Sequence, residues 1–351
     1  MMNRNIINIL WALLILQMTA CSADEEQKSG IANGKDRIIR FTASVSAPVY
    51  SKEGFTRAWA DEYNDRLPIN ATVFVYLYAY NDAESTALNV ATDQFGNSIT
   101  GFTYATQSEV DVASGRSPLA QTYPTVSDIS SNDPEDALPK FPASLSNDGY
   151  VEAVAIFLPE YANANMSGET LTFTAPADQT TQANVIKADL LTNEVSSTSK
   201  TSTAAINLDM RHRMCKVLVQ FTPTEGLTLE NMPNFTYLVE NVKTELSVSL
   251  PSGTVTTTGS TGNVNAMVGE PFFIAPQTIA AGTELLKFNL RNIGGTETGI
   301  KNVTLKPTTN LEFREGVYYV LNVSVGVRYI NLTTTIKDWT GETIIFDKKL
   351  L

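Results

Sequence analysis

The sequence is short of the side chains on which most enzymes depend. Among its 351 residues there are one histidine and two cysteines, and only 18% of the residues are charged. Because zinc, haem and iron–sulfur sites need clustered histidine or cysteine ligands, such sites are excluded, and a histidine-based triad would have to use His212. Acidic residues outnumber basic ones by 37 to 25, which gives a net charge of -12 and argues against a nucleic-acid partner.

Motifs that carry enzyme chemistry are also missing. There is no Gly-x-Ser-x-Gly elbow, phosphate-binding loop, dinucleotide fingerprint or His-Glu-x-x-His motif. A carboxylate pair for glycoside hydrolysis stays open, because 37 acidic residues always allow some pair. Asp133, Glu135 and Asp136 form either a calcium site or a solvated acidic turn, and they lack the spacing of a known calcium loop. We therefore predict a protein that is not an enzyme, with no catalytic residue, no metal and no cofactor.

The first 20 residues have the composition of a signal peptide. Arg4 is followed by a short apolar run, too short for a membrane span, and then by Met18-Thr19-Ala20-Cys21. These four residues resemble a bacterial lipobox, and the alternative is an ordinary secretory signal with a chance cysteine. We expect a signal peptide over residues 1–20, lipidation of Cys21, and a polar tether over residues 21–36. Cys215 would then have no disulfide partner.

From residue 37 onward the pattern is that of β-strands. Short alternations of apolar and polar residues are separated by Gly, Pro, Asn and Ser clusters, and no amphipathic helix period is convincing. Residues 37–45 are predicted to form a first strand. Its apolar face holds Phe41, Ala43 and Val45. Residues 73–80 are apolar on both faces, which is typical of a strand covered on both sides, and their aromatic stripe around Tyr76 is more typical of core packing than of ligand stacking.

The clearest boundary signals lie between residues 192 and 221. Residues 192–203 are almost purely polar, which marks either a domain boundary or a crossover. The apolar residues that follow share one strand face up to Met214, and the apolar phase then switches at Cys215. Such a switch indicates a bulge or a strand that changes sheets. We expect His212 to be a hydrogen-bonded core residue and Cys215 to be a small buried one.

The last third of the chain continues the β pattern. Residues 286–290 and 303–305 are predicted to pair as a hairpin. Residues 317–339 form the last long β run, and residues 342–351 form a short separate β segment at the C-terminal end. The fold class that these elements predict is all-β, with two β-sandwiches split near residue 195.

Several phrases of the sequence, taken in order, resemble the fimbrillin family of Bacteroidales, the subunits of type V pili. The resemblance covers residues 37–351 behind the lipobox. Its phrases are Phe141-Pro142-Ala143, Ala155-Ile156-Phe157-Leu158-Pro159, Asp178-Gln179-Thr180, Lys187-Ala188-Asp189-Leu190-Leu191, His212-Arg213-Met214-Cys215-Lys216-Val217, Ile274-Ala275-Pro276-Gln277-Thr278, Glu315-Gly316-Val317-Tyr318-Tyr319 and Ile336-Lys337-Asp338-Trp339. Two positions depart from the family pattern: Cys215 stands where Ser or Ala is more usual, and Phe157-Leu158-Pro159 replaces a tyrosine-rich version.

The resemblance implies two tandem β-sandwich domains of a transthyretin-like, Greek-key type, here residues 37–195 and 196–351. It also implies export as a lipoprotein to the outer membrane and cell surface. There a trypsin-like protease cuts after an arginine in the loop that follows the first strand, that strand leaves with residues 37–57, and a strand of another subunit fills the groove. On this chain the cut would fall between Arg57 and Ala58. Arg37 and Arg40 compete, but cuts there would leave the strand in place.

The resemblance also implies a donor strand, which would be residues 342–351. Ile344, Phe346 and Leu350 lie on one face of this segment, interrupted by Lys348. The alternative is that residues 343–351 form an edge strand of their own domain.

The function predicted on these grounds is that of a structural subunit of a cell-surface fimbria with a role in adhesion. Its partners would be other fimbrial subunits in a homo- or heteropolymer, the outer membrane through the lipid anchor, and a receptor on a host or bacterial surface. The alternative is a non-polymerising surface lipoprotein, an anchor or tip subunit, that binds glycan or host protein through its loops.

Overall fold

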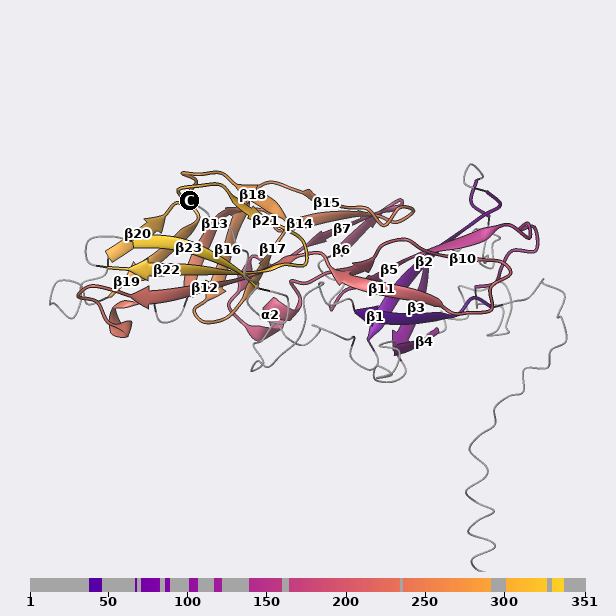
Figure 1. Ribbon diagram of the computed structural model, residues 1–351, viewed down its shortest axis with the longest axis horizontal. Helices are drawn as coiled ribbons and strands as arrows, with labels where there is room; N and C mark the ends of the chain where they lie inside the picture. Colours follow the sequence, from indigo (N-terminus) through magenta and orange to yellow (C-terminus); the bar gives the residue numbers. More distant parts are fainter. Residues whose placement is uncertain are drawn as a thin grey trace, which may run out of the picture.

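Strands dominate the computed structural model of the chain (Figure 1). The structure describes residues 38–45, 67, 71–82, 86–88, 101–106, 117–121, 139–159, 164–233, 236–291, 301–326 and 330–337. Within these ranges the α-helix is α2, Gln182–Ile186, and a 3-10 turn, η4, covers Leu229–Asn231. No helix among the described residues has the length and apolar character needed to cross a bilayer. The prediction of an all-β chain is confirmed.

Eight strands form the N-terminal sheet. They are β1 (Phe41–Val45), β2 (Thr72–Tyr80), β3 (Gly101–Thr106), β4 (Ser117–Gln121), β5 (Tyr150–Phe157), β9 (Leu191–Asn193), β10 (Ser196–Ser199) and β11 (Ile206–His212). Their order is β10-β5-β2-β3-β4-β1-β11-β9. Because β9 pairs with β5 as well as with β11, the sheet closes on itself. Alternate residues of β1, β2, β5 and β11 pack together in what we call the first core, so the period-two pattern of the first strand is confirmed.

Two further sheets form a β-sandwich in the C-terminal part of the chain. One contains β12 (Cys215–Pro223), β17 (Phe272–Ile274), β22 (Tyr318–Val325) and β23 (Ile330–Lys337), in the order β17-β12-β22-β23. The other contains β8 (Asp178–Gln179), β13 (Thr236–Val242), β16 (Gly262–Met267), β19 (Leu286–Leu290) and β20 (Lys301–Leu305), in the order β20-β19-β13-β16-β8. Apolar residues of both sheets share the second core.

A fourth sheet covers the outer face of β2 and β5. It consists of β6 (Ala164–Ser167), β7 (Thr170–Thr174), β14 (Glu245–Ser249) and β15 (Val255–Thr258), in the order β15-β14-β7-β6. Its inward residues share a third core with Tyr78 and Ile156, and Tyr76 packs against that core. The prediction that residues 73–80 are covered on both sides is confirmed. A small fifth sheet pairs β18 (Gln277–Ile279) with β21 (Leu311–Phe313).

The phase switch at Cys215 marks the point where the chain changes sheets. Strand β11 ends at His212 in the N-terminal sheet, and β12 begins at Cys215 in the C-terminal one. Met210 therefore belongs to the first core, Met214 to the third and Cys215 to the second. Of the two explanations for the switch, the change of sheet is confirmed.

The predicted hairpin of β19 and β20 is present, and the last long β run is itself a hairpin of β22 and β23. The division of the chain into two domains at residue 195 stays a prediction. Residues 164–179 supply strands that pair with strands beyond residue 244, whereas β10 and β11 pair within the N-terminal sheet. The chain thus crosses between its sheets more than once.

Two amide side chains, one buried and one partly buried, link neighbouring parts of these sheets. Gln179 is fully buried; its Nε2 donates to the Phe273 carbonyl at 2.9 Å and its Oε1 accepts from the Phe273 N–H at 2.7 Å. Gln277 makes the same pair of hydrogen bonds with Lys243: its Oε1 accepts from the Lys243 N–H at 2.9 Å, and its Nε2 donates to the Lys243 carbonyl at 3.0 Å. In each case the amide presents an N–H donor and a carbonyl acceptor to the backbone of one residue, as a neighbouring strand residue would.

Replacing Gln179 with leucine removes both hydrogen bonds that this side chain makes with the Phe273 backbone and nearly keeps the side-chain volume. We expect the free energy of unfolding to fall by about 2–3 kcal/mol, because buried polar groups lose their partners. Urea unfolding followed by circular dichroism measures this change. Gln220 is exposed on β12 and provides the matched control. If Gln179→Leu lowers the free energy of unfolding no more than Gln220→Leu does, the linking role assigned to Gln179 is wrong.

Candidate functional site

The first strand completes the N-terminal sheet between β4 and β11. It runs parallel to β11 from the Phe41–Ile206 pair to the Val45–Met210 pair. Its antiparallel pairing with β4 is shorter and ends at Ala43. Pro118 of β4 lies opposite Thr42, and proline has no N–H to donate to the ladder. The strand is therefore held mainly by β11 and only loosely by β4.

The inward side of β1 is fully apolar. Phe41, Ala43 and Val45 are 3%, 2% and 8% exposed and belong to the first core. The Phe41 ring packs edge-on against Tyr104, with 5.1 Å between ring centroids, and burial raises the pKa of the Tyr104 hydroxyl. Burying these three side chains contributes roughly 4–6 kcal/mol of gross transfer free energy. That amount helps to keep a short strand in place.

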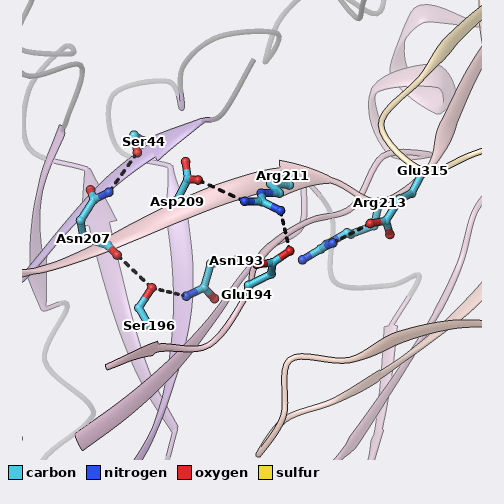
Figure 2. A network of polar contacts seen from close by, with 9 residues as sticks. All are labelled: Ser44, Asn193, Glu194, Ser196, Asn207, Asp209, Arg211, Arg213 and Glu315. Carbon is cyan, nitrogen blue, oxygen red and sulfur yellow. Dashed lines mark hydrogen bonds and ion pairs between the residues drawn. The ribbon is translucent and has the colours of Figure 1, made fainter. Parts of the chain in front are cut away.

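The amide of Asn207 hydrogen-bonds to the outward side of β1. Thr42 donates from its hydroxyl to Asn207 Oδ1 at 3.3 Å, and Asn207 Nδ2 donates to the Ser44 hydroxyl at 3.5 Å. Figure 2 shows the Asn207 amide between β11 and Ser44. Asn207 thus contacts both outward residues of β1, so a strand in this place is recognised on its polar side as well as on its apolar one.

Further along β11 the outward row is charged. Asp209 lies opposite Ser44 in the ladder. Its carboxylate is 3.8 Å from the Arg211 guanidinium, which also contacts Glu194 at 2.5 Å (Figure 2). All three side chains are substantially exposed, so these ion pairs add little to stability. They do place charged side chains close to any strand that pairs with this part of β11.

A second amide anchors this region to β5. The Ala155 N–H donates to Asn193 Oδ1 at 2.6 Å, and Asn193 Nδ2 donates to the Ala153 carbonyl at 3.1 Å. Asn193 Nδ2 also donates to the Ser196 hydroxyl at 3.0 Å, which in turn donates to the Asn207 carbonyl at 2.9 Å. The chain of hydrogen bonds in Figure 2 therefore runs from Asn193, which hydrogen-bonds to the β5 backbone, through Ser196 to Asn207, the residue that contacts β1.

Buried ionisable side chains hold the point where β11 becomes β12. His212 Nδ1 lies 2.6 Å from Asp189 Oδ2, and Asp189 Oδ1 accepts the Leu190 N–H at 2.9 Å. Gly316, whose φ is +67°, donates its N–H to the Met214 carbonyl, and a Cβ there would come within 3.2 Å of the His212 carbonyl. The expectation that His212 is a hydrogen-bonded core residue is confirmed.

Arg213 ties the same crossover to its surroundings. Its Nε donates to the Thr192 hydroxyl at 2.7 Å, and its Nη1 contacts Glu315 at 3.0 Å (Figure 2). Cys215 is buried beside it and donates from Sγ to the Arg314 carbonyl. Burial, and next the nearby Glu315 carboxylate, raises the pKa of the Cys215 thiol, which disfavours the thiolate form. Cys215 is a small buried residue, as predicted.

None of the site residues predicted from the sequence falls within the described residues. Cys21, Arg57, Ala58 and the donor residues Ile344, Phe346 and Leu350 all lie outside them. Asp133, Glu135 and Asp136 lie outside as well. Among the residues that are described, no group of three His, Cys, Asp or Glu side chains is arranged to hold a metal ion.

The contact residues Asn193 and Asn207 were not anticipated. Asparagine is common in turns and on strand surfaces, and nothing in the sequence distinguishes these two from the others. Their contacts depend on the pairing of β1 with β11 and on the junction of β9 and β10, which local sequence does not specify.

A hollow of about 380 Å³ lies between β15 and the β18–β21 pair. Its walls include Leu246, Val255 and Phe313, and the Glu312–Arg314 ion pair stands at its rim at 2.8 Å. The charged residues of this lining, Glu312, Arg314 and Glu315, have exposed side chains. The alternative of a ligand-binding surface protein stays a prediction.

Comparison with known proteins identifies the fold family. The sequence profile of the fimbrillin-like family matches residues 147–339, which is more than half of the chain. The chain belongs to the fimbrillin-like family. Membership implies a structural fimbrial protein of the cell surface that associates with other fimbrial subunits. None of the curated proteins is significantly similar to this fimbrillin-like chain in sequence.

Solved structures share the fold of this fimbrillin-like protein. A proposed cell adhesion protein of Bacteroides uniformis aligns over 87% of this chain and 99% of its own, with a TM-score of 0.52 and 13% identity. A second one, of Bacteroides ovatus, aligns over 89% of this chain and 99% of its own, with a TM-score of 0.53 and 13% identity. At this level of identity the likeness concerns the fold.

Proposed function

We propose that this fimbrillin-like protein is a fimbrial subunit that assembles by strand exchange at the position of β1. The observation that carries the proposal is the place of β1 in the N-terminal sheet. It is the first described strand, and it lies between β4 and β11 in a closed sheet that would be open at this point without it. It also buries an apolar face in the first core. Its departure leaves β4 and β11 each with an unpaired edge, which is a template for another strand.

The strength of attachment of β1 suits such an exchange. The strand has five residues, and its ladder with β4 is short and includes a proline. The roughly 4–6 kcal/mol from its three inward side chains is enough to keep it docked after the chain is cut. A replacing strand with equal or better contacts can then displace it, because a protein–strand joint of this kind depends on backbone pairing and on side-chain fit together.

Processing and anchoring complete the proposal. The chain would be exported as a lipoprotein through Cys21 to the outer membrane, and cut between Arg57 and Ala58, which follow β1 in the sequence. Residues 342–351, with Ile344, Phe346 and Leu350 on one face, would be the strand donated to another subunit, and the fibre would mediate adhesion. In this role the protein performs no catalysis.

An arginine variant tests the processing step. Limited trypsin treatment of the full chain should give a fragment that starts at Ala58, and in the presence of the other fimbrial subunits this fragment should then join into ladders that resist SDS. Arg57→Ala should abolish both results, because the first strand stays covalently attached. Arg40→Ala is the matched control, and it should leave cutting and ladders unchanged. Ladders from Arg57→Ala equal to those of the wild type would contradict the assignment.

A further inference from the structure

The place that β1 occupies favours some strand sequences over others. Its requirements can be compared with the sequence of the proposed donor segment, residues 342–351. The three inward positions are at most 8% exposed, carry no charge, and hold the small residue Ala43 in the middle. No charged side chain of β1 enters the first core. A strand that replaces β1 must therefore be uncharged at three alternate positions, because an unpaired buried charge costs far more than a surface one.

The C-terminal segment of this chain does not meet that condition. Its charged residues are Glu342, Asp347, Lys348 and Lys349. They are spaced so that every five-residue window from Glu342 to Leu351 has one of them at its first, third or fifth position. These are the positions that would point inward in a strand of the length of β1, whether it runs parallel or antiparallel to β11. Every register of this segment would thus bury a charge in the first core.

The size of the side chains adds to the mismatch. Ala43 packs within the first core and is 2% exposed. The arrangement that centres the segment on its largest apolar residue would put Phe346 where Ala43 lies, and a larger side chain in a filled core forces its neighbours to move. The outward row differs too, since Asn207 meets two hydroxyls in β1 but would meet residues such as Ile345 or Asp347.

We propose, on the basis of the strand exchange proposed above, that the β1 position accepts a strand from a different subunit rather than the C-terminal segment of a second copy. The accepted strand carries uncharged apolar side chains at three alternate positions, the middle one small, with hydroxyl-bearing side chains between them that hydrogen-bond Asn207. This chain then occupies a junction between unlike subunits in its fibre and does not extend a homopolymer.

Competition between peptides tests the inference. The full chain, cut with limited trypsin, is mixed with fluorescent peptides that cover residues 38–46, residues 342–351, and residues 342–351 with Lys348→Leu. The first peptide should enter and displace β1. The unaltered C-terminal peptide should bind at least about 100-fold more weakly, because burying its charge costs several kcal/mol and each 1.36 kcal/mol is tenfold. Lys348→Leu should recover at least about tenfold.

The outcomes separate this inference from the function on which it rests. If the unaltered C-terminal peptide binds as tightly as the peptide of residues 38–46, the selectivity is wrong while the exchange stands. If Lys348→Leu brings no gain over the unaltered peptide, the buried-charge argument is wrong. If no peptide enters the cut protein, the β1 position does not exchange, and both the proposed function and this inference fall.

Discussion

Replacing Ala43 with lysine is expected to lower the free energy of unfolding by at least about 4 kcal/mol at pH 7, because the change puts an unpaired charge in a core. Ala43 is 2% exposed and belongs to the first core together with apolar residues of β2, β5 and β11. Urea unfolding followed by circular dichroism gives the magnitude.

The pH dependence of Ala43→Lys has a defined sign. Burial favours the neutral amine, so the lysine pKa in the folded state lies below its unfolded value of about 10.4. The unfolded chain then binds more protons between the two pKa values, and the stability of the variant relative to the wild type rises as the pH rises through that window. Thr42→Lys, on the outward side of the same strand, is the control and should cost less than about 1 kcal/mol. Equal losses for both variants would show that β1 does not pack as described.

Replacing His212 with leucine is expected to lower the free energy of unfolding by about 3–5 kcal/mol, because removing one member of a buried pair leaves the other uncompensated. His212 and Asp189 are both nearly fully buried, and 2.6 Å separates their side-chain atoms. The pair lies at the crossover from β11 to β12, so the loss should affect the N-terminal and C-terminal sheets together rather than one alone. Chemical unfolding monitored by circular dichroism measures it.

A double variant distinguishes the lost pair from a packing defect. Asp189→Asn removes the charge but keeps an oxygen that can accept the Leu190 N–H. The combination of His212→Leu with Asp189→Asn should therefore recover at least about 1 kcal/mol relative to His212→Leu alone. If the double variant is no more stable than the single one, the buried charge of Asp189 is not what makes the histidine necessary.

Short-range features of the fold could be predicted from the sequence. The alternation of Phe41, Ala43 and Val45 places them correctly on one face of β1, since side chains in a strand alternate with a period of two. The phase switch at Cys215 predicts one of two events, and the change of sheet is the one observed. The burial of His212 and Cys215 follows from the same pattern.

Long-range pairing could not be predicted in the same way. The closing contact of β5 with β9, and the pairing of β7 with β14 across some 70 residues, depend on how distant segments meet and not on any local pattern. The roles of Asn193, Asn207 and Gln179 follow from those pairings. Asn193 and Gln179 hydrogen-bond to the backbone of β5 and β17, and Asn207 to two hydroxyls of β1, so the role of each amide exists only in the folded chain.

The proposed assembly by loss of β1 accounts for these observations together. The strand that would leave is the one whose ladder on one side is short and includes Pro118, and the strand that stays, β11, continues directly into the C-terminal sheet. Contacts made by an incoming strand would thus act on β11, whose end at His212 is fixed by buried hydrogen bonds.

The N-terminal residue of the protein isolated from the cell surface tests the central claim most directly. Assembly by strand exchange at β1 requires that residues 37–57 have been removed, so sequencing of the fimbrial fraction should begin at Ala58. A surface protein whose N-terminus is a blocked, acylated Cys21, with β1 still attached, would contradict the account.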